Sequence, residues 1–481
     1  MRDMLLVLDF DHMAARMIAR KLRAERICCK ILPGDAPAER IAAQEPLGLI
    51  LAGSALGTET VEPAAGALSS APVLALSSMA AWLCAFLGGT PGDVAIKNEI
   101  RRVTFTACPL LEGLEAGDRM VNAMRTLTLS SDMKALSALE ETGETVGFSD
   151  ASGRLLGMQM EIEQHDPEGD LLLANFALNI CGCTPWWDED AFVLRSVQEI
   201  KRLAGEGSAI CAMTGGLNSG VSALLAYRAL GARLKCVFVD TGLLRDAEGD
   251  KFMAFYHDQM GLDITRVDAE ERFLTALSGV RSGEEKRRVI GALLKEILTS
   301  EREKTEGLSV LIRGTSYSDV LNEAAQSDTE EGLTLIEPVR DLFKDEIRQV
   351  GEYLGMPADI ISRQPFPGSG LAPRIMGEVT RERLKTLRHA DEIFRDEVLA
   401  AGQAKRLWQF FAVLSPAYLD QGDIISLRAV HATDGAMAYA ARLYYDVLES
   451  VVKRILTECP SVRRVVYDMT PSTNYSGIEW Q

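Results

Sequence analysis

Residues 209–230 read AICAMTGGLNSGVSALLAYRAL and decide the fold of the second half of the chain. An apolar run up to Met213 meets a glycine-rich turn, and a run with helical periodicity follows. This order predicts a buried strand, a tight turn and a helix whose first N–H groups face an anion. We therefore expect a phosphate cradle made by Thr214, Gly215, Gly216, Asn218, Ser219 and Gly220. A glycine-rich turn of this kind can also serve packing alone.

The segments that follow support a ligand site at the same edge of a parallel sheet. Asp240 ends the apolar run 234–240, and Gly314 comes directly after the run 308–313. Lys344 opens a helical stretch beyond the run 333–338. Because open α/β sheets bind ligands at the carboxyl ends of their strands, we expect Asp240, Gly314 and Lys344 to join the cradle.

The first 187 residues predict a separate doubly wound α/β domain. Short apolar runs at 5–10, 27–32, 47–52 and 72–76 alternate with helical stretches, and Thr184-Pro185-Trp186-Trp187 suits a domain edge. Residues 63–92 carry no charge, yet their prolines and glycines favour a buried strand and a buried helix over a membrane span. We predict domains at 1–187, 188–360 and 361–481, the last a small α+β domain after a proline- and glycine-rich loop.

Composition limits the possible partners. The formal net charge is −18, which argues against nucleic acid and anionic membranes as general partners. Nine scattered cysteines and an N-terminus without a signal peptide predict a cytoplasmic protein with reduced thiols. With five histidines in the whole chain and no second cysteine pair to match Cys181-Gly-Cys183, we predict no zinc site.

Several longer strings point to a family. CVFVDTGLLR (236–245), KRRVIG (286–291), RGTSYSDV (313–320), IEPVRDLFKDEIR (336–348), PFPGSGLAPRI (365–375) and IEWQ (478–481) together resemble the GMP synthase family over nearly the whole chain. The resemblance implies a class I glutamine amidotransferase-like (flavodoxin-like) domain, an ATP-pyrophosphatase domain of the adenine-nucleotide alpha-hydrolase-like fold, and a small α+β dimerisation domain.

The same resemblance implies the chemistry and the partners. The family pattern is the adenylation of XMP by ATP with Mg²⁺, followed by ammonia displacing AMP to give GMP. It implies a homodimer and pyrophosphate held by residues 214–220, with Lys344 on phosphate oxygens. It places a purine nucleotide acceptor near Pro367, Gly368, Ile478 and Glu479.

The glutaminase motifs of the family are altered. Its GICYG nucleophile elbow becomes Ala75-Leu-Ser-Ser-Met79, so Ser77 replaces the thiol, and we expect the bulk of Met79 to disfavour the strained turn. Its FHPE becomes Met160-Glu-Ile-Glu163, so Glu161 replaces the imidazole and Glu163 ends the motif. A serine hydroxyl without a base is a poor nucleophile, and we predict no glutamine hydrolysis. His165 lies nearby, and we interpret it as a solvated loop residue.

The synthetase motifs are altered less uniformly. The loop aspartate becomes Asn218, which weakens Mg²⁺ binding, and the final serine becomes Gly220. A basic lid becomes the acidic segment 322–331, and the lysine before IEW is missing from 472–477. Three hypotheses stay open: a catalytically degenerate nucleotide-binding or regulatory paralogue, an ATP-dependent ligase using free ammonia or another nucleophile, and ordinary GMP synthase activity.

Overall fold

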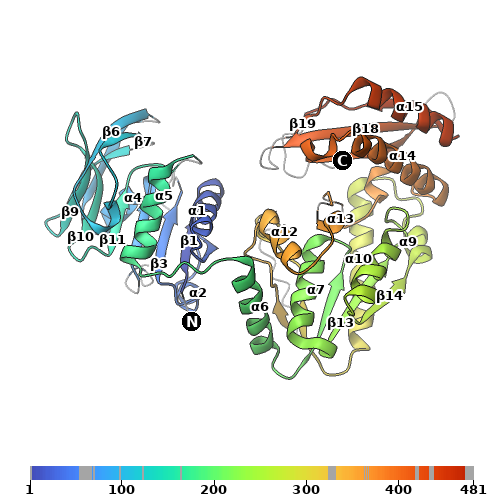
Figure 1. The fold of residues 1–481 in the computed structure, drawn as a ribbon, viewed down its shortest axis with the longest axis horizontal. Coiled ribbons are helices and arrows are strands. Elements are labelled where there is room, and N and C mark those ends of the chain that lie inside the picture. Colours follow the sequence, from blue (N-terminus) through green and yellow to red (C-terminus); the bar gives the residue numbers. More distant parts are fainter. Residues whose placement is uncertain are drawn as a thin grey trace. The chain divides into compact units, whose positions relative to one another are not determined.

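The computed structural model describes residues 3–53, 68, 71–96, 99–121, 124–162, 165–322, 332–361, 363–364, 366, 368–417, 422–432 and 438–471. The chain forms two compact units, Met1–Phe192 and Val193–Gln481 (Figure 1). Helix α6 (Glu189–Ala204) runs across the boundary. No helix among the described residues is both long enough and apolar enough to cross a membrane.

Unit 1 is built on a nine-stranded sheet of order β2-β1-β3-β4-β11-β10-β9-β6-β7. The first five strands are parallel, with Leu5 opposite Cys29 and Gly48, and the remaining strands are antiparallel. The strands are β1 (Leu5–Asp9), β2 (Cys29–Pro33), β3 (Gly48–Ala52), β4 (Val73–Leu76), β6 (Glu99–Phe105), β7 (Gly117–Val121), β9 (Met133–Leu139), β10 (Thr145–Asp150) and β11 (Leu155–Met158).

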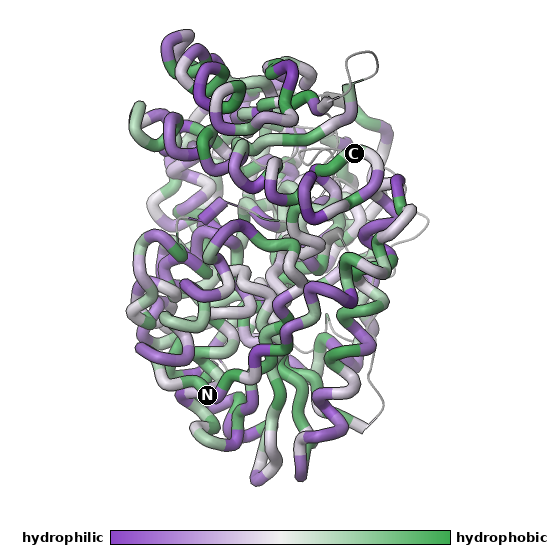
Figure 2. Tube along the Cα trace, turned by 90° about the vertical axis from the view of Figure 1, so that its right-hand side faces the viewer, coloured by the Kyte–Doolittle hydropathy of each residue, from purple (hydrophilic) through white to green (hydrophobic). Residues whose placement is uncertain are grey.

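The remaining elements of unit 1 follow the amphipathic pattern. Helix α1 buries Ala15, Ile18, Ala19 and Leu22 against the sheet, and Asp11 caps its N-terminus. The helices are α1 (His12–Ala24), α2 (Ala38–Ala42), α4 (Ser78–Phe86) and α5 (Pro167–Asn175), and β5 (Thr90–Ile96) pairs with β8 (Met124–Thr128). In the hydropathy colouring of Figure 2, hydrophilic and hydrophobic positions alternate along the helices, as one-sided burial requires.

The charge-free stretch forms β4 and α4, which confirms the predicted buried strand and helix. The antiparallel strands β6 to β10 were not predicted. In β6, which reads EIRRVTF, Val103 is the one buried residue and charged residues interrupt the apolar ones. Such half-exposed strands lack the continuous apolar runs on which the prediction relied.

Unit 2 contains a parallel five-stranded sheet of order β14-β13-β12-β15-β16. Its strands are β12 (Ser208–Met213), β13 (Leu234–Asp240), β14 (Ile264–Asp268), β15 (Leu308–Ile312) and β16 (Thr334–Ile336). Its helices before residue 362 are α7 (Leu217–Leu230), α8 (Glu248–Met253), α9 (Glu270–Ala276), α10 (Gly283–Glu303), α11 (Tyr317–Asn322), α12 (Lys344–Tyr353) and α13 (Ala358–Ile361). Strands β12 and β13 have the predicted bounds, and the neighbouring strands differ by a few residues at most.

The last part of unit 2 is α+β, as the sequence indicates. A mixed sheet of β17 (Gln409–Pro416), β18 (Asp423–Ala432), β19 (Ala438–Ala440) and β20 (Val462–Tyr467) carries α14 (Arg381–Ala400) and α15 (Tyr445–Glu458). One hydrophobic core runs from Ile210 and Val237 through Leu371 to Phe410 and Ile455. This shared core joins both parts of the unit, and the division near residue 360 stays a prediction.

Candidate functional site

The turn from β12 into α7 presents backbone N–H groups at the carboxyl edge of the sheet. Gly215 has φ +77°, a left-handed conformation that glycine adopts without steric cost. Gly216 is the N-cap of the 14-residue helix α7 and makes no side-chain capping bond. The first N–H groups of α7 are therefore not capped by a side chain, as an anion site at a helix N-terminus requires.

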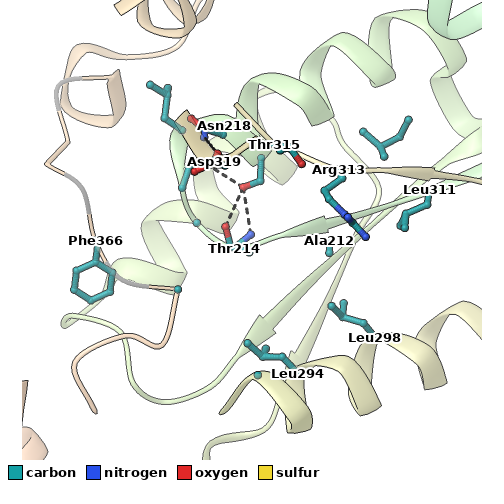
Figure 3. A pocket seen from close by; sticks show the side chains of 18 of the residues that line it. Ala212, Thr214, Asn218, Leu294, Leu298, Leu311, Arg313, Thr315, Asp319 and Phe366 are labelled. Carbon is teal, nitrogen blue, oxygen red and sulfur yellow. Dashed lines mark hydrogen bonds between the residues drawn. The ribbon is translucent and has the colours of Figure 1, made fainter. Parts of the chain in front are cut away.

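Two hydroxyl groups hold the turn in shape. The Ser219 hydroxyl donates to the Gly216 carbonyl at 3.0 Å and accepts from the Thr214 N–H at 3.3 Å. The Thr214 hydroxyl lies 3.3 Å from that of Ser219 (Figure 3). Ser219 therefore braces the loop and Thr214 lies at its exposed side.

Gly314 lets a second loop approach the cradle. A Cβ atom at this position would lie 2.6 Å from both the Cα and the nitrogen of Ser219. Only glycine fits that distance to backbone atoms without displacing them. The segment after β15 is thus held against the first turn of α7.

A cavity of about 700 Å³ opens beside this cradle. It is lined by most residues predicted for the cradle: Thr214, Gly215, Gly216, Asn218, Ser219, Gly314 and Lys344. Gly368, which was predicted for the acceptor, lines it as well. Its apolar wall consists of Ile210, Ala212, Leu294, Leu298, Leu311 and Ile312 (Figure 3). A polar cradle at one end and an apolar wall at the other suit a ligand with an anionic and a flat apolar part.

The charge of the lining is strongly positive. Among the described lining residues, one carries a carboxylate, Asp319, and six carry a cation: Lys295, Arg302, Arg313, Lys344, Arg348 and Arg363. No carboxylate of the described chain pairs with Lys295, Arg313, Lys344 or Arg348. In a chain of net charge −18, this local excess of unpaired cations indicates an anionic ligand.

Arg363 ties the cradle to the loop that follows α13. Its guanidinium donates to the Gly215 carbonyl at 2.9 Å and pairs with Glu248. Burial, together with the nearby Arg245 and Arg395, lowers the pKa of Arg363 to about 10. Arg363 therefore stays charged at neutral pH and fixes the position of Gly215.

Phe366 lies on the cavity wall and also packs against the core of unit 2. The guanidinium carbon of Arg245 lies 4.3 Å from its ring centroid. A lone aromatic residue after a proline gives no positional signal, so the sequence does not place Phe366 at the cavity.

Two residues predicted for the cradle do not line the cavity. The Asp240 carboxylate pairs with Arg266 at 2.5 Å and accepts from the Gly242 N–H at 3.1 Å. Gly220 lies on the buried side of α7, where an added Cβ would be 2.0 Å from the Tyr256 hydroxyl. The sequence placed both at the correct element but could not show which way each faces.

In unit 1, Ser77 occupies the turn between β4 and α4 with φ +53° and ψ −128°. This backbone is rare for a residue with a side chain and is typical of a nucleophile elbow. Met79 is fully buried in the core of unit 1. The expectation that Met79 would disfavour the turn was wrong, because its side chain points into the core and away from the strained backbone.

The hydroxyl of Ser77 meets no base among the described residues. It donates to the Met160 carbonyl at 3.3 Å, while Ser78 donates to the Gly53 carbonyl at 3.1 Å. The half-buried Glu161 is anchored through its backbone N–H to the Met120 carbonyl at 3.2 Å, and His165 is exposed. The turn has the backbone shape of an elbow, but its hydroxyl donates to an amide carbonyl, which cannot remove the proton as a base.

Four predicted site residues, Glu163, Pro367, Ile478 and Glu479, lie outside the described residues. Of the acceptor residues predicted near Pro367, Gly368 lines the cavity. Among the residues that the sequence analysis missed, Arg348 follows Lys344 by four positions on α12, a spacing that signals a shared helix face. Asp319 and Arg363 became visible only through their contacts in the fold.

The two units have the fold class of a glutamine amidotransferase-like domain followed by an ATP-pyrophosphatase-like domain. The model of the GMP synthase C terminal domain matches residues 396–480. A GMP synthase [glutamine-hydrolyzing] of Symbiobacterium thermophilum is 36% identical, with 100% of this chain and 99% of the relative covered. That of Clostridium perfringens is 35% identical, with 100% of both chains covered. The chain therefore belongs to the GMP synthase family.

Among solved structures, an NMN synthetase from Francisella tularensis covers 38% of this chain and 78% of its own length. It is 14% identical, with a TM-score of 0.32, a value too low to assign function or fold. The family assignment rests on the full-length relatives.

Proposed function

We propose that this member of the GMP synthase family binds a purine nucleotide polyphosphate in unit 2 and does not hydrolyse glutamine. The observation that carries the proposal is the cavity beside α7, with its glycine cradle and its unpaired cations Lys344, Arg313 and Arg348. ATP fits this arrangement, because its phosphates match the cradle and its base matches the apolar wall. The protein acts as a nucleotide-binding or regulatory paralogue.

The loss of glutaminase activity follows from the surroundings of Ser77. Amide hydrolysis by a hydroxyl needs a base that takes its proton, and the Met160 carbonyl cannot do so. In subtilisin, removing one member of such a constellation lowers the rate by about a millionfold. Ammonia from this route is therefore not expected.

The loss of XMP amination is proposed on the sequence departures around the acceptor. Residues 323–331 contain Glu323, Asp328, Glu330 and Glu331 where the family has a basic lid. Carboxylates at that position repel the phosphate of a nucleotide acceptor. The lysine that precedes IEW in the family is also missing.

A second function, an ATP-dependent ligase that uses free ammonia or another nucleophile, is favoured by one observation. Lys344 and the cradle share one cavity with room for more than a polyphosphate. Such a ligase would convert ATP to AMP and pyrophosphate on XMP or on a different acceptor.

Turnover assays separate the alternatives. Purified protein is incubated with glutamine, with ATP, XMP and ammonium, and with ATP and a panel of other acceptors, while ammonia, pyrophosphate and GMP are measured. We expect none of the three products. GMP formed from ammonium would establish ordinary synthase activity, pyrophosphate formed only with another acceptor would establish the ligase, and ammonia from glutamine would overturn the account of Ser77.

The family pattern also supports a cytoplasmic homodimer formed through residues 361–481, which we include in the proposal. Light scattering of the full chain tests the dimer. A monomer at micromolar concentration would contradict it.

A further inference from the structure

Asn218 and Asp319 are joined in a way that bears on the metal expected at a nucleotide site. The Asn218 side-chain amide donates to Asp319 Oδ2 at 3.1 Å (Figure 3). The same oxygen accepts from the Ser316 N–H at 2.8 Å and from the Ser316 hydroxyl at 2.6 Å. Three donors therefore converge on one carboxylate oxygen.

The arrangement of Asn218 and Asp319 leaves no site for Mg²⁺ between the two side chains. The cation prefers oxygen ligands, commonly carboxylates together with phosphate oxygens. Here an N–H group faces the carboxylate, and a cation cannot share the space that this proton occupies. Among the residues that the structure describes, no group of three or more acidic, histidine or cysteine side chains is placed to hold a metal ion.

The positive charge comes instead from the protein. Lys344 opens α12, Arg348 follows one turn later, and Arg313 directly follows β15; all three line the cavity. Because no carboxylate of the described chain neutralises these three side chains, their positive charges are available to bind the phosphates of a nucleotide. They can neutralise the charge that a divalent cation neutralises at other nucleotide sites.

We propose that this cavity binds the free nucleotide polyphosphate without a divalent cation, with the Asn218 amide in the place of a bridging metal. The inference rests on the proposed nucleotide site and specifies the ionic form of its ligand. Because Mg²⁺ lowers the charge of ATP, the magnesium complex should bind more weakly than free ATP.

Calorimetric titration of the full chain with ATP, in EDTA and in excess Mg²⁺, tests the inference. We expect binding in EDTA and an affinity at least threefold lower in Mg²⁺. Binding only in Mg²⁺, or at least tenfold tighter in Mg²⁺, would overturn the inference and leave the nucleotide site standing. No binding in either buffer would overturn both.

Two variants test the role of Asn218. Asn218→Asp places two carboxylates within hydrogen-bond distance, and we expect at least tenfold weaker binding of ATP in EDTA with recovery in Mg²⁺. Asn218→Ala removes the hydrogen bond without adding charge, and like the unaltered chain it should bind ATP more weakly in Mg²⁺ than in EDTA. Thermal melts of both variants in EDTA and Mg²⁺ report folding separately. If Asn218→Asp binds ATP equally in both buffers, the amide does not stand in for a metal.

Discussion

The turns at Ser77 and at Gly215–Gly216 are built alike, and they have changed in opposite ways. Each leads from a buried parallel strand into a helix, β4 into α4 and β12 into α7. The first has a strained backbone, and its Ser77 hydroxyl donates to the Met160 carbonyl and to no base among the described residues. The second has helix N–H groups that no side chain caps, and its Asn218, which stands where the family pattern has an aspartate, is bound to Asp319. Backbone shape therefore persists where the core requires it, and chemistry depends on a few side chains.

The largest effect is expected at Gly314. Gly314→Ala would place a Cβ 2.6 Å from backbone atoms of Ser219, so the cradle must move. We expect a loss of about 1–3 kcal/mol in the free energy of unfolding. The affinity for ATP should fall roughly 100-fold, since several charge-assisted hydrogen bonds depend on the displaced loop.

Calorimetry and thermal melts measure both effects. Gly283→Ala is the matched control, because an added Cβ there meets no atom within 4 Å. An affinity unchanged in Gly314→Ala would show that the cradle does not bind ATP.

The next effect is expected at Lys344. Lys344→Ala removes a cation that lines the cavity without a carboxylate partner in the described chain. We expect ATP to bind about 10- to 100-fold more weakly, as for a lost hydrogen bond between charged groups. Lys235→Ala is the control, because Lys235 pairs with Asp263 away from the cavity. Equal losses in both variants would contradict a specific contact.

A smaller effect, on the free energy of unfolding, is expected at Gly220 on the buried side of α7. The family pattern has serine where this chain has Gly220, and the Tyr256 hydroxyl fills the space that a Cβ would need. Burial raises the pKa of this buried tyrosine, so it remains neutral. Gly220→Ser should lower the free energy of unfolding by about 1–3 kcal/mol through overpacking.

The Gly220→Ser/Tyr256→Phe double variant tests whether residues 220 and 256 are energetically coupled. We expect denaturant melts to give a loss smaller than the sum of the single losses, because the removed hydroxyl relieves the clash. Strict additivity would mean that the serine is accommodated elsewhere.

The sequence predicted the turn at Gly215–Gly216 better than the turn at Ser77. The glycines and hydroxyls from 214 to 219 lie in one short segment, so local chemistry alone indicated the cradle. The Asn218–Asp319 bond joins residues 101 positions apart, and Arg363 reaches Gly215 across 148, so both depend on the tertiary fold. The direction of Asp240 toward Arg266 likewise depends on the neighbouring strand β14. The size of Met79 led to the prediction that the turn at Ser77 is disfavoured. That prediction was wrong because sequence does not show which side chains a core accommodates.

The smallest effect is expected at Ser77, where two variants test whether the backbone of the turn is strained. At φ +53° and ψ −128° a residue with a side chain is strained by about 1–3 kcal/mol, and the hydroxyl recovers part of this through its bond to Met160. Ser77→Gly loses the hydrogen bond and the strain, whereas Ser77→Ala loses the hydrogen bond alone. We expect the glycine variant to be more stable than the alanine variant by about 1 kcal/mol in chemical denaturation. Ala247→Gly, at φ +52° in unit 2, should shift in the same direction. Equal stability of the two Ser77 variants would mean that the turn is relaxed, and the contrast with the cradle would then lie in side chains alone.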